Sequence, residues 1–89
     1  MQQANVTIIN RLGLHARAAA KFVNLAKTFA STIALSKGSE EADGKSIMSV
    51  MLLAAPVGTS IALSVAGPDE EEAFAALQAL INDRFGEEE

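Results

Sequence analysis

The pattern of apolar and polar residues along the chain predicts four β-strands, two of them from strict alternation. A period of two places every second side chain on one face of a sheet, so the apolar positions mark the buried face. The clearest case is 59–66, where Ile61, Leu63 and Val65 share one face. A β-branched run between two asparagines predicts the first strand, and a short segment before an Asp-Gly turn is typical of an edge strand. The predicted strands are 6–9, 32–36, 40–42 and 59–66.

Helical periodicity predicts three helices. The first starts at Ala16 and ends near Phe29, with one apolar face and one polar, basic face. The second covers 47–54, with Ser46 as its N-cap, and a Pro and a Gly end it. In the third, Asp69 with Glu72 three residues later resembles a capping box. Its apolar stripe is Ala73, Phe74, Leu77, Leu80 and Ile81, with Arg84 near its C-terminus and Gly86 at its end.

The order of these elements is strand, helix, strand, strand, helix, strand, helix (βαββαβα). Each strand has one apolar face that needs a cover, and the helices can supply it from one side. We therefore predict an α+β fold, an open-faced β-sandwich in which three helices cover one face of a four-stranded antiparallel sheet. The length of 89 residues suits one domain over 1–89.

Composition and charge narrow the functional classes. The chain is 49% hydrophobic and 20% charged, which is typical of a globular protein. The absence of cysteine favours a reducing compartment, so we expect a cytoplasmic protein. A net charge of −4 disfavours nucleic acid as a partner, and no apolar run is long enough to predict a membrane span.

The single histidine, His15, lies where it can do chemistry. It follows Gly13 and Leu14 and directly precedes the first predicted helix, whose first backbone N–H groups lack intrahelical partners. Such a terminus binds anions, and Arg17 can pair with phosphate through two hydrogen bonds. The same positive potential disfavours the imidazolium form and stabilises a phosphoryl group on the ring. A lone histidine is more often structural, so its position carries this hypothesis.

Apart from His15, the sequence shows no catalytic motif or residue cluster. It has neither of the glycine-rich nucleotide motifs GxxxxGK[ST] and GxGxxG, no paired carboxylates placed for catalysis and no metal-ligand cluster. We therefore expect no cofactor and no metal. The phosphoryl group must come from another protein, which makes the chain a carrier and not an autonomous enzyme.

Two separated segments resemble the signatures of one family. NRLGLHARAAAKFV at 10–23 resembles the active-site segment of the HPr family, the histidine phosphocarriers of the bacterial phosphoenolpyruvate-dependent phosphotransferase system. GKSIMSVM at 44–51 resembles the segment around the regulatory serine of that family. The spacing between the segments matches too, and the similarity covers nearly the whole chain. The resemblance implies four antiparallel strands and three helices.

The resemblance also implies roles and partners. It implies a phosphoryl group on Nδ1 of His15, stabilised by Arg17, with the backbone N–H groups of Ala16, Arg17 and Ala18 toward the phosphate. The implied donor is an enzyme I type protein and the acceptor an enzyme IIA type domain, while an HPr kinase/phosphorylase would act on Ser46. We expect a monomer. The implied docking surface consists of Ala16, Arg17, Ala20, Lys21, Asn24, Lys27, Ile47, Met48, Met51 and Leu52.

The chain departs from the family pattern at Ala18, where many members have proline. Alanine keeps an N–H that can donate toward the phosphate. The segment 10–17 and the acidic C-terminus favour the nitrogen-related branch, NPr. The segment 45–48 also resembles carriers that a kinase phosphorylates on serine. A sugar-transport HPr regulated at Ser46 is therefore the alternative.

Simpler explanations exist for several of these residues. Ser46 could only cap a helix, and 87–89 is most simply a solvated tail. Methionine and leucine at helical spacing usually belong to a core, although Val50, Leu53 and Ala54 are also available for burial in the second helix. From another functional class, the chain would be a protein-binding regulatory domain whose histidine is never phosphorylated.

Overall fold

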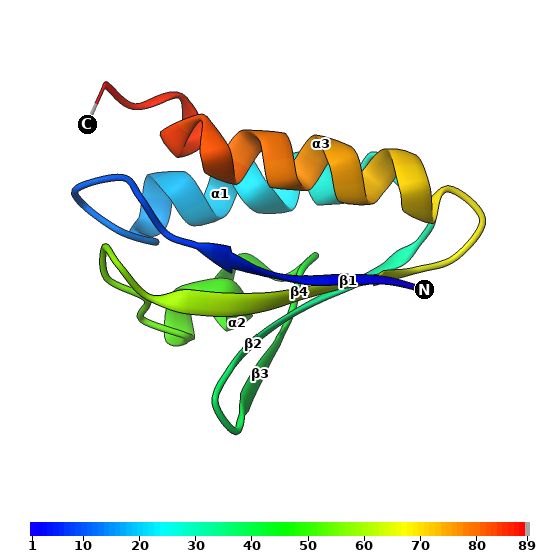
Figure 1. The fold of residues 1–89 in the computed structure, drawn as a ribbon, viewed down its shortest axis with the longest axis horizontal. Coiled ribbons are helices and arrows are strands. Elements are labelled where there is room, and N and C mark those ends of the chain that lie inside the picture. The colour runs from blue at the N-terminus through cyan, green and yellow to red at the C-terminus, as the bar shows by residue number, and fades with distance from the viewer. Residues whose placement is uncertain (89) are drawn as a thin grey trace.

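The computed structural model describes residues 1–88, and the predicted order of elements is confirmed within them (Figure 1). The strands are β1 (Gln2–Thr7), β2 (Thr32–Lys37), β3 (Glu40–Asp43) and β4 (Ser60–Ala66). The helices are α1 (Ala16–Ala26), α2 (Ile47–Leu52) and α3 (Glu70–Asn82), and one turn of 3-10 helix, η1 (Arg84–Gly86), follows α3.

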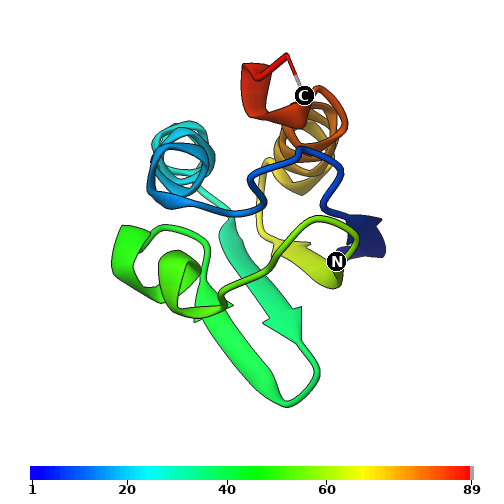
Figure 2. The same ribbon diagram turned by 90° about the vertical axis from the view of Figure 1, so that its left-hand side faces the viewer.

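The four strands form one antiparallel sheet in the order β1-β4-β2-β3. In the central strand β4, Ile61, Leu63 and Val65 are buried, while Ala62 and Ser64 between them are only half-buried. This alternation is that of a sheet with one covered face. The helices lie on one side of the sheet, as Figure 2 shows. The predicted open-faced β-sandwich is therefore confirmed.

The core lies between the helices and the sheet. Helix α1 buries one face there, and α3 packs over β1 and β4. Phe85 of η1 is also fully buried. The buried residues of α1 are Ala18, Ala19, Phe22, Val23 and Ala26. The core thus fixes the start of α1 against the sheet, and His15 directly precedes that start.

The first strand was predicted too late in the chain. β1 begins at Gln2 and ends at Thr7, where the prediction was 6–9. The pairing runs from Gln2 opposite Val65 to Thr7 opposite Ser60. Pairing with β4 therefore makes polar residues part of the strand, although their sequence alone does not predict one. Ile8 lies beyond the strand but is buried.

The predicted helix ends were too late. Helix α1 ends at Ala26, because Thr28 and Phe29 donate to carbonyls only three residues back, at 3.0 and 3.2 Å. Helix α2 ends at Leu52, and Ala54, predicted to be available for burial, is exposed with a φ of 49°. Helix α3 ends at Asn82, before Gly86.

The predicted capping box at Asp69 is wrong. Its carboxylate makes no capping hydrogen bond and instead accepts from the backbone N–H groups of Ala30 and Ser31, at 2.8 and 2.9 Å. These hydrogen bonds, with that from the Ser31 hydroxyl as the largest cause, lower the pKa of Asp69. The carboxylate thus ties the start of α3 to the segment before β2.

Among the helices of residues 1–88, none combines the length and the apolar character that crossing a bilayer requires.

Candidate active site

The loop between β1 and α1 is held in one shape, which places His15. Gly13 has a φ of +70°, and a Cβ there would lie 2.6 Å from the carbonyl oxygen of Ala55. The side chain of Asn10 donates to the Gly13 carbonyl at 2.7 Å, and the Leu14 N–H donates to the Ala55 carbonyl at 2.8 Å. The loop is therefore fastened to the segment after α2, and only glycine fits at its turn.

His15 is the N-cap residue of α1. Its backbone is extended, with φ −78° and ψ 178°, and its carbonyl accepts the first helical hydrogen bond from Ala19 at 2.8 Å. Its side chain does not cap the helix, so the imidazole is available for other contacts. The N–H groups of Ala16, Arg17 and Ala18 are the first-turn groups that a helix leaves without intrahelical partners, and that turn carries no acidic residue. This terminus suits an anion.

The prediction of a solvated tail is wrong for Glu87, which lies against His15. One carboxylate oxygen contacts Nε2 of the imidazole, and the other accepts a hydrogen bond from the Asn10 side chain at 2.8 Å. The side chain of Glu87 is 13% exposed and that of His15 is 24% exposed. The hydrogen bond from Asn10, followed by that from His15, lowers the pKa of Glu87. Glu88 is exposed, and Glu89 lies outside the described residues.

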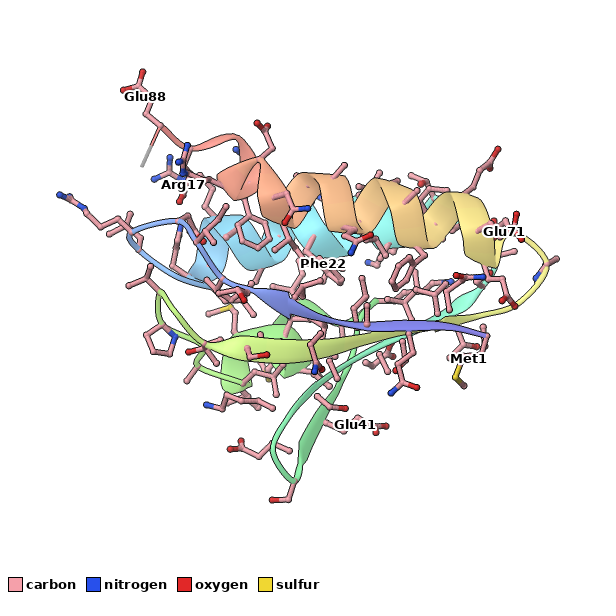
Figure 3. All side chains as sticks on the ribbon, viewed as in Figure 1. Met1, Arg17, Phe22, Glu41, Glu71 and Glu88 are labelled. Carbon is pink, nitrogen blue, oxygen red and sulfur yellow. The ribbon has the colours of Figure 1, made fainter. Side chains whose placement is uncertain are left out.

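Basic side chains share a cavity with Glu87. Arg17 lies close to the C-terminal segment at the end of the molecule that carries His15 (Figure 3). A shallow cavity of about 310 Å³ lies there, and it contains three cationic side chains. Its lining residues are Arg11, Leu12, Arg17, Lys21, Gly86, Glu87 and Glu88. His15 itself does not line this cavity, but its contact residue Glu87 does, and guanidinium and ammonium groups of this kind can bind an anion.

The predicted docking residues lie on two neighbouring helices, except for Lys27, which follows the last residue of α1 as its C-cap. Those of α1 are exposed, except for the half-buried Ala20, and those of α2 form an apolar patch. Met48 and Leu52 are 72% and 71% exposed, whereas Val50 is fully buried. The alternative that Met48 belongs to the core is therefore wrong. The α2 patch consists of Ile47, Met48, Met51 and Leu52, which line one shallow groove.

Ser46 caps α2 as predicted. Its hydroxyl accepts from the Ser49 N–H at 3.3 Å, and its side chain is half-buried at the edge of the α2 patch. The neighbouring Lys45 donates to the carbonyl of Phe29 at 2.8 Å, which links α2 to the end of α1.

Two residues that contact the site had no role in the sequence analysis. Asn10 lies inside the recognised segment but is fully buried, and Glu87 is 72 residues away from the histidine. No periodicity or spacing joins Glu87 to His15, so only the fold reveals that contact. Within residues 1–88, no three histidine, cysteine or carboxylate side chains are grouped as metal ligands.

Comparison with known proteins shows the family of this chain. A family profile described as "PTS HPr component phosphorylation site" matches residues 2–83. The phosphocarrier protein HPr of Cupriavidus necator is 54% identical over 89 residues, and that of Pseudomonas aeruginosa 51% over 90, each alignment covering both chains completely.

Solved structures agree as well. HPr-C-His from Thermoanaerobacter tengcongensis matches with a TM-score of 0.95 at 45% identity over the whole of both chains. An HPr from Bacillus anthracis matches with a TM-score of 0.84 at 40% identity, over 88% of this chain and 93% of that one. The chain therefore belongs to the HPr family, the phosphocarriers of the phosphotransferase system.

Proposed function

We propose that this phosphocarrier holds its phosphoryl group on Nδ1 of His15. The observation that supports this best is the partly exposed ring at the N-terminus of the 11-residue helix α1, next to Arg17. A helix terminus stabilises a nearby anion by about 0.3–1 kcal/mol, and a hydrogen bond to a charged group contributes about 1.5–3 kcal/mol. Arg17 is therefore the larger contributor, and the N–H groups of Ala16, Arg17 and Ala18 add to it.

The partners we propose are proteins. An enzyme I type donor, itself phosphorylated from phosphoenolpyruvate, delivers the group, and an enzyme IIA type domain accepts it. Both dock on the exposed side of α1 and on the α2 patch, because a flexible methionine surface adapts to unlike partners. The chain works as one domain over 1–89, as a cytoplasmic monomer without a cofactor, and depends on these proteins for catalysis.

Phosphorylation by an enzyme I type protein tests this proposal. The wild type, incubated with that protein and labelled phosphoenolpyruvate, should acquire an acid-labile, base-stable phosphate. His15→Ala should acquire none while keeping its circular dichroism spectrum. Labelling of His15→Ala would refute the assignment of the acceptor. An unlabelled wild type, with an active donor, would favour the protein-binding regulatory domain.

The branch we propose is the nitrogen-related one. The support is the segment 10–17 together with the acidic C-terminus. Donors of the nitrogen-related and sugar branches are tested side by side at equal concentration. The nitrogen-related donor should phosphorylate His15 faster. Faster transfer from the sugar-branch donor would favour the sugar-transport HPr instead.

Ser46 supports that alternative through its place beside the α2 patch. A phosphate there adds about −1.5 to −2 charges next to apolar residues that a partner must desolvate. The rate of His15 phosphorylation should then be lower in Ser46→Asp than in Ser46→Ala, without a change of fold. Equal rates in both variants and the wild type would leave Ser46 as a helix cap only.

A further inference from the structure

The C-terminal segment is fastened to α1 at Phe85 before it reaches His15. Phe85 is fully buried, and its carbonyl accepts a hydrogen bond from the Lys21 ammonium group at 2.8 Å. The chain turns here, with a φ of 53° at Phe85. Figure 2 shows this segment leaving α3 on the side of the molecule where α1 begins. Glu87 is therefore presented to His15 from a fixed support.

The carboxylate of Glu87 is itself oriented. Asn10, fully buried, uses its Nδ2 group to donate both to the Gly13 carbonyl at 2.7 Å and to one oxygen of Glu87 at 2.8 Å. Both neighbours of Nδ2 are acceptors, which assigns the orientation of this amide. The remaining Glu87 oxygen faces Nε2 of His15. A continuous chain of contacts thus runs from the active-site loop to the imidazole.

This contact selects one form of the neutral ring. The lowered pKa of Glu87 keeps its carboxylate ionised at neutral pH, and an ionised carboxylate can only accept hydrogen bonds. The hydrogen between Glu87 and His15 must therefore be on Nε2. A neutral imidazole with its proton on Nε2 has its free lone pair on Nδ1.

We propose that Glu87 is a positioning residue, which holds His15 in the Nε2–H tautomer and so keeps the Nδ1 lone pair available to attack phosphorus. This inference rests on the proposed role of His15 as acceptor. A carboxylate that fixes the tautomer of a histidine is a general device of nucleophilic sites. Here the carboxylate comes from the other end of the chain.

The transfer step then balances without a further reactant. The Nδ1 lone pair forms the N–P bond while the bond between phosphorus and the phosphorylated donor protein breaks, and that electron pair leaves with the donor. The proton stays on Nε2, so the ring becomes positively charged. The same Glu87 contact offsets this charge.

The tautomer of His15 is the test, and ¹⁵N NMR of the ring measures it at a pH where the ring is neutral. In Glu87→Ala, the ratio of the Nε2–H to the Nδ1–H tautomer should fall about tenfold, since one charge-assisted hydrogen bond is lost. In Glu87→Gln it should fall further. Asn10 holds the amide oxygen of the new side chain, so its NH₂ group faces Nε2 and favours a proton on Nδ1.

The control is Glu71→Gln, which removes a carboxylate at the far end of α3 (Figure 3) and should keep the wild-type ratio. Both Glu87 variants should also lower kcat for phosphorylation by the donor, with an unchanged KM for the carrier. A Glu87→Gln ratio at or above that of the wild type would overturn the proposal. Because the NMR ratio needs no phosphorylation, it would stand even if His15→Ala accepted phosphate and the proposed acceptor failed.

Discussion

At the scale of a single residue, Arg17 should matter for phosphoryl transfer but hardly for stability. Its guanidinium group is exposed, and exposed charges contribute little to folding. A phosphate contact is worth about 1.5–3 kcal/mol, so Arg17→Ala should slow phosphoryl transfer about ten- to a hundredfold with a nearly unchanged melting temperature. Arg17→Lys keeps the charge without the planar fork and should be intermediate. Wild-type transfer rates in Arg17→Ala would contradict this role.

Gly13 determines the shape of the loop that carries His15. Replacing it tests two effects, backbone strain at a positive φ and a steric clash of the added Cβ. Gly13→Ala combines a positive φ with a Cβ 2.6 Å from a backbone oxygen. Gly38→Ala is the matched control, because its φ is +62° but nothing lies within 4 Å of the added Cβ. In urea unfolding, Gly38→Ala should lose about 1 kcal/mol and Gly13→Ala about 2–4 kcal/mol. Equal losses would mean that the loop yields to the added methyl group.

The two faces of helix α2 have different roles. Val50 joins the core, while the α2 patch faces solvent beside α1. Apolar side chains this exposed cost little to replace in the free protein but matter when a partner covers them. The helix is therefore short and apolar nearly all round because one face serves folding and the other serves binding.

Met48→Glu should test that division. A charge on the α2 patch must be desolvated when an enzyme I type partner docks, so the KM for the carrier should rise at least about tenfold. Met48→Leu keeps the apolar surface and should behave like the wild type. Circular dichroism and the melting temperature should be the same for both. Unfolding of Met48→Glu would instead show that this residue supports the fold.

At the scale of the whole molecule, three carboxylates connect distant segments and should make stability depend on pH. Asp69 accepts hydrogen bonds from the segment before β2, Glu70 pairs with the N-terminal ammonium group at 2.8 Å, and Glu87 accepts from Asn10. Each of these contacts lowers the pKa of its carboxyl group from an ordinary value of 3.8 for Asp or 4.5 for Glu.

A lowered pKa in the folded state means that the unfolded chain binds protons first as the pH falls. The contribution of these groups is therefore complete above about pH 5 and is lost as the pH falls through 4.5 and 3.8 toward the lowered values. Melting temperatures from pH 7 to pH 3 should fall most steeply below pH 4.5. Asp69→Asn should flatten this fall. An equally steep fall in Asp69→Asn would assign the acid sensitivity to other groups.

The sequence by itself determined the order of elements, the inward face of β4, the cap at Ser46 and the place of His15 before α1. These features depend on periodicity and on neighbours a few residues apart, so the local sequence is enough to predict them. The two signature segments added the family, and with it the proposed roles of His15 and Arg17.

Only the tertiary structure decided which distant residues meet. Gln2 and Gln3 become strand because β4 pairs with them, and Asp69 reaches the segment before β2 instead of capping α3. Glu87 lies against His15 because the buried Phe85 brings the C-terminal segment over α1. Such contacts depend on how the helical layer packs on the sheet, and packing between remote segments leaves no periodic trace in the chain.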